Sequence, residues 1–222
     1  METKMIITID GPAGAGKSTV SKELAGKLGY IYLDTGALYR ALAYKLLKAG
    51  IAVDNFAGLE SLCSDTSVVL KNINGQLKVY VDGEDVGDKI RTEEVGLMAS
   101  KMSAFAVVRR SLLHLQREAA AQGGVVAEGR DMASVVFPYA DYKFYLDADV
   151  EERIKRRRKE LLSKGDSAEQ EKIQRDMLTR DRQDSQREIA PLKPAEDAVI
   201  IDSTGLSVAE VVERIIGEVS HK

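Results

Sequence analysis

Short apolar runs alternate along this chain with longer segments in which apolar residues recur at helical spacing. The runs are apolar throughout instead of alternating with polar residues, as expected for strands of a parallel sheet covered on both faces. We therefore predict a three-layer α/β/α fold with a five-stranded parallel sheet. The predicted strands are 5–10, 30–34, 125–128, 142–147 and 198–202, and the predicted helices are 17–28, 36–49, 92–122, 150–163, 168–188 and 206–219.

One stretch interrupts this alternation. Segments rich in β-branched residues, 67–73 and 76–81, flank the dipeptide Asn74-Gly75 and are followed by Asp82-Gly83. Asn-Gly and Asp-Gly accept the positive φ angles that tight hairpin turns need. The pattern predicts a small antiparallel β insertion at about 62–91.

Composition limits the class of protein. The 222 residues include 35 Asp and Glu against 32 Lys and Arg, with 44% hydrophobic residues and a net charge of −3. This is typical of one globular domain with a buried core and excludes a wholly disordered chain. It also argues against a dedicated nucleic-acid binder, which carries a basic excess over much of its surface. An anion site must therefore be local.

Cysteine, histidine and hydropathy exclude further classes. Cys63 is the single cysteine and cannot form an intrachain disulfide, and His114 and His221 lie too far apart for zinc spacing. No apolar run approaches the roughly 20 residues of a membrane span, and the run at 5–9 is shorter than the apolar region of a signal peptide. We expect a cytoplasmic protein without a membrane partner.

The most specific motif follows the first predicted strand and opens the first predicted helix. It fits the pattern G-x-x-x-x-G-K-[ST], whose backbone N–H groups cradle phosphate oxygens at a positive helix N-terminus. Its lysine reaches the β and γ phosphates and its hydroxyl ligates Mg²⁺. The motif predicts a P-loop fold of the NTP-hydrolase type that binds a nucleoside triphosphate. Its residues are Gly11, Pro12, Ala13, Gly14, Ala15, Gly16, Lys17, Ser18 and Thr19.

The phosphate loop alone leaves the reaction open. The chain contains no N-K-x-D segment, which disfavours a regulatory GTPase, and its many arginines suit phosphoryl transfer to an anionic acceptor. A phosphate acceptor is already ionised near neutral pH and needs no general base. Two alternatives stay open: a kinase of another small metabolite, and a nucleotide-dependent switch protein that binds RNA through the basic run 153–159.

Four segments together resemble a known family, the bacterial cytidylate kinases. The resemblance extends from Met5 to about Arg214 and implies transfer of the γ-phosphate of ATP to CMP or dCMP, with Mg²⁺, and UMP as a poorer substrate. The segments are IDGPAGAGKST (9–19), LDTGALYR (33–40), EGRD (128–131) and RDRQDSQR (180–187).

The resemblance also implies roles for individual residues. Cytosine displays an amino donor beside two acceptors, so a carboxylate with nearby donors can read it. By motif position, the residues that bind the acceptor phosphate are Arg40, Arg130 and Arg187. The residues that bind the sugar are Arg180 and Asp184, and those that read the base are Ser100, Arg109 and Asp131. Thr35 is a further substrate-side candidate, and Lys17, Arg130, Arg187, Arg153 and Arg157 are the candidate catalytic residues.

The expected organisation is a single P-loop kinase domain over 1–222. Its core is 1–61, 92–150 and 188–222, a monophosphate-binding insertion covers about 62–91, and a helical lid covers about 151–187. Arg153 and Arg157 are expected to reach ATP phosphates when the lid closes. The protein is expected to be a monomer whose partners are small nucleotides, with no nucleic acid bound. Without the resemblance, Arg180, Asp184 and Arg187 could equally be surface pairs of one helix face.

Overall fold

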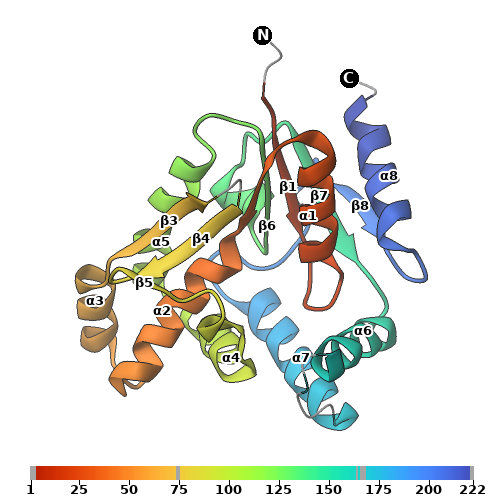
Figure 1. The fold of residues 1–222 in the computed structure, drawn as a ribbon. Helices are drawn as coiled ribbons and strands as arrows, with labels where there is room; N and C mark the ends of the chain where they lie inside the picture. The colour runs from red at the N-terminus through yellow and green to blue at the C-terminus, as the bar shows by residue number, and fades with distance from the viewer. Residues whose placement is uncertain (1–3, 74–75, 164, 166–168, 221–222) are drawn as a thin grey trace.

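The computed structural model describes residues 4–73, 76–163, 165 and 169–220 and contains a five-stranded parallel sheet in the order β2-β6-β1-β7-β8 (Figure 1). The predicted parallel sheet is thereby confirmed. The phosphate loop follows the central strand, where parallel strands present their carboxyl ends to ligands. The strands are β1 Ile6–Asp10, β2 Ile31–Asp34, β6 Val125–Gly129, β7 Tyr142–Asp147 and β8 Val199–Asp202.

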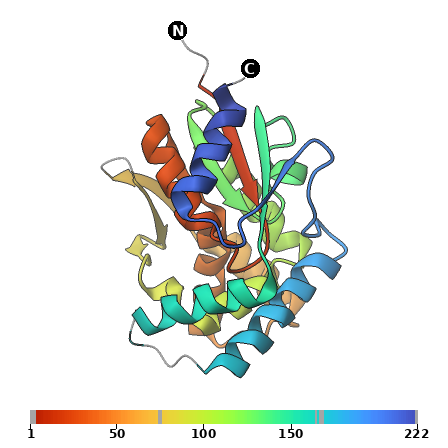
Figure 2. The same cartoon turned by 90° about the vertical axis from the view of Figure 1, so that its right-hand side faces the viewer.

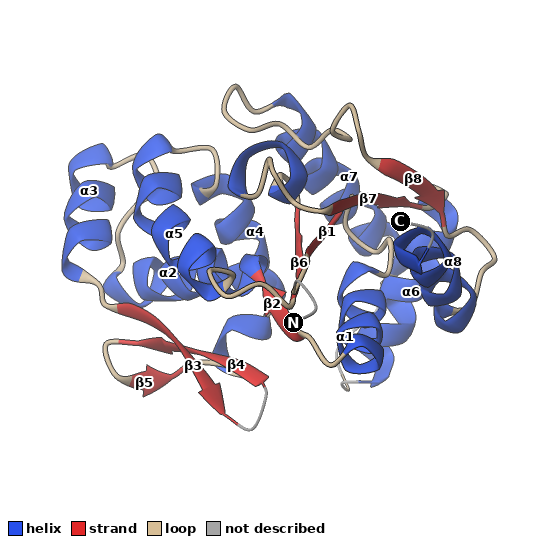
Figure 3. Cartoon of the chain, turned by 90° about the horizontal axis from the view of Figure 1, so that it is seen from above, coloured by secondary structure: helices blue, strands red, loops and turns tan. Residues whose placement is uncertain are grey.

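Helices cover both faces of this sheet (Figure 3). Alternate residues of β6 show why its sequence is continuously apolar. Val126 packs with Ile7 and Ile9 in a core closed by helices α1 and α8, whereas Val125 and Ala127 pack in a second core on the opposite face. The helices are α1 Lys17–Leu28, α2 Thr35–Ala49, α3 Phe56–Asp65, α4 Glu93–Met102, α5 Ala106–Ala119, α6 Val150–Ser163, α7 Gln170–Gln186 and α8 Val208–Ser220, with a 3₁₀ turn η1 at Lys89–Arg91 and a π-helical turn η2 at Met132–Val136.

The prediction of one helix over 92–122 is wrong. The helix divides into α4 and α5 although no proline or glycine lies at the break. The Ser103 hydroxyl donates to the Ser100 carbonyl at 2.7 Å, a local bond that competes with helix continuation. Phe105 then adopts extended backbone, with φ −90° and ψ 127°, and its ring meets Phe56 edge to face at 5.6 Å between centroids. The ring contact with α3 and partial burial against the neighbouring core stabilise Phe105 in this conformation.

Helix α3 is not predicted by the apolar pattern. It begins after Asn55, whose side chain accepts a hydrogen bond from the Gly58 N–H at 3.0 Å. Asparagine is a strong N-cap residue, so the cap was visible in the sequence although the short apolar face was not distinctive. Leu59 and Leu62 bury this face.

The predicted antiparallel segment is present as a three-stranded sheet of β3 Val68–Ile73, β4 Gln76–Val81 and β5 Glu84–Asp85. Asp82 and Gly83 both have positive φ, 50° and 85°, as their turn requires. The Asn74-Gly75 turn lies outside the described residues. Val79 and Val81 join a hydrophobic core shared with α2, α3, α4 and α5, so this sheet folds as part of a larger unit.

Helices α6 and α7 lie across the end of the molecule that is opposite the two termini (Figure 2). They pack on each other through Ile154, Leu161, Ile173 and Met177, and Ala13 of the phosphate loop contacts this small core. The helices following β7 are thus placed directly over the loop. None of the helices in the described part of the chain is long and apolar enough to cross a bilayer.

Candidate active site

The phosphate loop wraps between β1 and α1 as its motif predicts. Gly11 has φ 147°, and a Cβ at this position would lie 2.0 Å from the Leu146 carbonyl oxygen of β7, so only glycine fits. Lys17 is buried and its Nζ donates to the Pro12 carbonyl at 2.7 Å. Burial, followed by repulsion from Arg130, lowers the pKa of Lys17 to about 7. The bond to Pro12 therefore holds Lys17 at the loop, where a phosphate would favour the charged form of the lysine.

A cavity of about 1290 Å³ extends from this loop to α4. It brings together residues from widely separated segments, so that the donor loop and the predicted acceptor residues face one space. Most of the predicted site residues line it: Ala13, Gly14, Ala15, Gly16, Lys17, Ser18, Thr19, Thr35, Arg40, Ser100, Arg109, Arg130, Asp131, Arg157, Arg180, Asp184 and Arg187. Gly11 and Pro12, at the start of the loop, and Arg153 of α6 are not part of this lining.

Asp34 organises one wall of the cavity. Its Oδ1 accepts from the Ala37 N–H at 2.9 Å and caps α2, while its Oδ2 accepts from Arg40 at 2.8 Å and from Arg91 at 2.9 Å. Burial pushes the pKa of Asp34 upward, but the two guanidinium groups outweigh burial and lower it below its ordinary value. The carboxylate therefore stays ionised and orients Arg40. Thr35 donates to the Glu128 carbonyl at 2.7 Å and joins α2 to β6.

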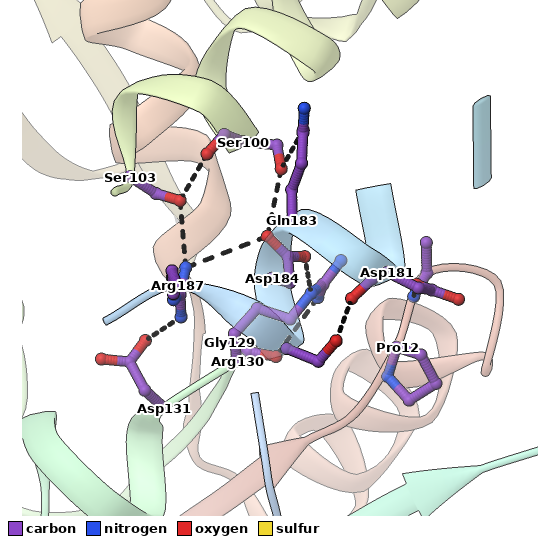
Figure 4. A network of polar contacts seen from close by, with 12 residues as sticks. Pro12, Ser100, Ser103, Gly129, Arg130, Asp131, Asp181, Gln183, Asp184 and Arg187 are labelled. Atoms are coloured by element: carbon purple, nitrogen blue, oxygen red, sulfur yellow. Dashed lines mark hydrogen bonds and ion pairs between the residues drawn. The ribbon is translucent and has the colours of Figure 1, made fainter. Parts of the chain in front are cut away.

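Asp184 of α7 organises the opposite wall (Figure 4). Its Oδ2 accepts from Arg130 Nε at 2.8 Å and its Oδ1 accepts from the Ser100 hydroxyl at 3.1 Å. Arg187 Nη1 is 3.9 Å from the same Oδ1. Burial acts to raise the pKa of Asp184, yet Arg130 and Arg180 lower it below its usual value. One buried carboxylate thus fixes the directions of several predicted ligand groups.

Asp131 lies deep at the acceptor end and receives two arginines. Arg109 donates to its Oδ2 from Nη2 and to the Ser103 carbonyl from Nη1, the latter at 3.2 Å. Arg187 approaches the other oxygen, Oδ1, at 3.5 Å and donates to the Ser103 hydroxyl at 3.0 Å (Figure 4). These contacts give the pocket a carboxylate surrounded by donors, the complement that a cytosine edge needs.

Two buried arginine nitrogens have no hydrogen-bond partner within the described residues: Nε of Arg40 and Nε of Arg180. Burial, and then repulsion from Arg130, lowers the pKa of Arg180 to about 10. Unpaired buried donors cost free energy, and an anion bound between them would satisfy both their hydrogen bonds and their charge. The cavity is therefore built for an anionic ligand.

Some contributors were not found from the sequence. Ser103 enters the site only because the helix breaks there, and the spacing Ser100-x-x-Ser103 inside a helical pattern was the available signal. Arg91 contacts Asp34 from the short turn η1. The Tyr32 hydroxyl donates to Glu128 at the loop side of the cavity, so this tyrosine is more than a packing residue.

The lid arginines occupy different places. Arg157 lines the cavity and forms ion pairs with Glu93 at the start of α4 and with Glu160 at 2.5 Å. Arg153 is buried against the backbone of the phosphate loop. The ion pair of Glu93 with Arg157 therefore joins the lid to α4 at the cavity wall.

The loop side of the cavity offers oxygen donors to a magnesium ion. The Ser18 hydroxyl is exposed on the cavity, and the Glu128 carboxylate also lines it. The described residues contain no cluster of three or more His, Cys, Asp or Glu side chains that could hold a metal. This donor set fits Mg²⁺, which takes few protein ligands beside water and nucleotide phosphates.

A phosphate loop that faces a basic cavity at the carboxyl ends of a parallel sheet defines a P-loop phosphotransferase. The family model described as cytidylate kinase matches residues 7–221. The chain is 51% identical over 212 residues to the cytidylate kinase of Geobacter sp. (strain M21), covering 96% of this chain and 91% of that protein. It is 48% identical over 223 residues to that of Geobacillus kaustophilus (strain HTA426), covering 100% and 99%. The chain belongs to the cytidylate kinase family.

A solved structure has a similar fold. An uncharacterized protein from Eubacterium ventriosum (ATCC 27560) superposes with a TM-score of 0.56 at 12% identity, covering 99% of this chain and 100% of that one. At this identity the likeness concerns the arrangement of helices and strands alone.

Proposed function

We propose that this protein transfers the γ-phosphate of ATP to CMP or dCMP and releases ADP with CDP or dCDP. One observation carries the proposal: Asp131, which accepts from Arg109 and Arg187, lies in the same cavity as the phosphate loop. A carboxylate accepts a hydrogen bond from the N4 amine of cytosine. The O4 carbonyl of uracil offers no hydrogen at the same position, and its oxygen would repel the carboxylate. UMP is accordingly the poorer acceptor.

The arginines supply the means of transfer. An oxygen of the CMP phosphate attacks the γ-phosphorus of ATP, and the bond to the β–γ bridging oxygen breaks, leaving its electrons on ADP. The acceptor oxygen is already ionised, so the step depends on positioning and charge stabilisation. Arg40, Arg130 and Arg187 hold the acceptor phosphate, while Lys17 and the loop amides hold the donor. When bound, Mg²⁺ neutralises phosphate charge beside Ser18.

The remaining groups complete the two substrate sites. Arg180 and Asp184 hold the sugar of the acceptor, and Ser100, Arg109 and Asp131 read its base. Arg157, already at the cavity wall, turns from Glu93 to the donor phosphates. Arg153 supports the donor site from behind the loop. We further propose that the chain is divided into the core, monophosphate-binding insertion and lid expected from the sequence. We also propose that the protein is a monomer and is located in the cytoplasm.

A kinase whose acceptor is a neutral hydroxyl fits the cavity less well. Such an acceptor needs a carboxylate free to take its proton. The acceptor-side carboxylates Asp34, Asp131 and Asp184 are each already bound by guanidinium groups. A phosphate acceptor makes no such demand.

An ADP-release assay with CMP, dCMP, UMP, AMP, GMP and shikimate at equal concentrations tests the proposal. Turnover should be fastest with CMP or dCMP. Faster turnover with any other acceptor would overturn it.

A further inference from the structure

Arginines of the lid contact backbone carbonyls of the phosphate loop. Arg153 lies outside the lining of the cavity, whereas Arg156 and its partner Ser203 also line the cavity. Arg153 Nη1 donates to the Ala13 carbonyl at 3.0 Å. One turn along α6, Arg156 Nη1 donates to the Ala15 carbonyl at 3.3 Å, and the Ser203 hydroxyl lies 3.2 Å from the same oxygen. Two alternate carbonyls of the loop are therefore held by one helix.

The geometry of the peptide unit gives these contacts a consequence. In a trans peptide the C=O of one residue and the N–H of the next point in opposite directions, and the described chain contains no cis peptide bond. Holding the Ala13 and Ala15 carbonyls outward turns the N–H groups of Gly14 and Gly16 inward. These are N–H groups of the loop that cradles phosphate.

The preceding peptide, between Pro12 and Ala13, is held in the reverse sense. The Pro12 carbonyl points inward and accepts from Lys17, and the Ala13 N–H points outward to Asp181 Oδ1 at 3.2 Å. Asp181 Oδ2 also pairs with Arg153 at 2.5 Å. One buried ion pair thus grips both the N–H and the C=O of Ala13.

The supporting groups are themselves fixed. Arg153 Nε donates to the Ala148 carbonyl at 3.0 Å, and Arg156 Nη2 donates to the Ser203 carbonyl at 2.7 Å. The contact with the loop is also close, because a Cβ on Gly14 would lie 3.0 Å from the Arg153 carbonyl oxygen. Neither arginine can turn away from the loop without breaking several bonds.

We propose that Arg153 and Arg156 are positioning residues that keep the loop amides aimed at the donor phosphates, with Asp181 and Ser203 as their partners. The inference rests on the proposed function and extends it: α6 shapes the donor site through the loop backbone as well as by covering it. Loss of the Arg153 or Arg156 contacts alters affinity for the donor nucleotide and leaves the acceptor pocket intact.

Calorimetric titration of the full chain with ADP, with the non-hydrolysable analogue AMPPNP and with CMP tests this proposal. Arg156→Met removes the donors of a half-buried side chain, and Arg158→Met is the matched control on an exposed position of the same helix. We expect Arg156→Met to weaken ADP and AMPPNP equally, by about tenfold, with CMP affinity and Tm nearly unchanged. Arg158→Met should alter none of these.

A second variant separates positioning from direct contact. Ser203 and Arg156 act on the same carbonyl, so their effects should be coupled. The double variant Arg156→Met with Ser203→Ala should therefore lose less affinity for ADP than the product of the losses in the two single variants. Unchanged ADP affinity, a loss confined to AMPPNP, or equal losses of ADP and CMP would each overturn the proposal. If the unaltered protein binds no ADP, the proposed kinase function itself fails.

Discussion

The guanidinium carbon of Arg109 lies 5.7 Å from the centroid of the Tyr39 ring, over its face. Arg109 also donates to Asp131, so the aromatic ring supports the arginine that orients the proposed base-reading carboxylate. Tyr39 thereby has a positioning role in addition to packing.

Tyr39→Leu should raise KM for CMP by about fivefold, since a partly desolvated cation–π contact contributes about 1 kcal/mol. Tyr39→Phe keeps the ring and should stay close to the unaltered enzyme. Steady-state kinetics with CMP as the varied substrate measures both. Equal effects of the two substitutions would show that the ring face is not what matters.

Asp131→Asn should narrow the preference for CMP over UMP. The asparagine amide offers a donor to the O4 carbonyl of uracil and no longer repels it, and a well-made base contact contributes about 1–3 kcal/mol of discrimination. The ratio of kcat/KM for CMP and UMP should fall by about tenfold or more. A ratio that does not move would remove Asp131 from base recognition.

Binding of ADP should take up a proton on Lys17. The pKa of Lys17 is lowered to about 7 in the free protein, and a bound polyphosphate raises it. Above pH 7, the complex with ADP therefore binds more protons than the free protein. The affinity for ADP consequently falls as the pH rises above 7.

Calorimetry at pH 7.5 in buffers of different ionisation enthalpy reports this uptake directly. Lys17→Ala should abolish it together with phosphoryl transfer, while the thermal unfolding transition is retained. Proton release on binding, or the same uptake in Lys17→Ala, would contradict this protonation of Lys17.

Arg157→Gln should lower kcat by about tenfold or more with KM for CMP nearly unchanged, because one missing donor at the transferring phosphate weakens transition-state stabilisation. Arg158→Gln, on the exposed neighbouring position, is the control for loss of charge. Stopped-flow measurement of a single turnover separates this effect from product release. A normal rate in Arg157→Gln would show that Arg157 pairs with Glu93 without contributing to phosphoryl transfer.

The sequence predicted the elements whose signals are local. The strand ends around Asp10, Asp34 and Glu128 follow from apolar runs that stop at polar residues. Asp34 is a residue type that favours helix caps, and its side chain caps α2 by accepting from the Ala37 N–H. The phosphate loop needed only its glycines and its place between strand and helix.

The contacts that remained hidden join segments far apart in the chain. The break at Ser103 is accompanied by the contact of Phe105 with Phe56 of α3, which no spacing within 92–122 reveals. Arg156 stands in a run of like charges, and its bond to Ala15 depends on the crossing of α6 over the loop. Such roles follow from tertiary packing, whereas the charge run alone is equally compatible with a solvated helix face.

A crystal structure with ADP and CMP bound together tests the central claim most directly. The account predicts the β-phosphate of ADP against the N–H groups of Gly14 and Gly16, and the CMP phosphate between Arg40, Arg130 and Arg187, facing it. CMP bound away from these three arginines would contradict the account.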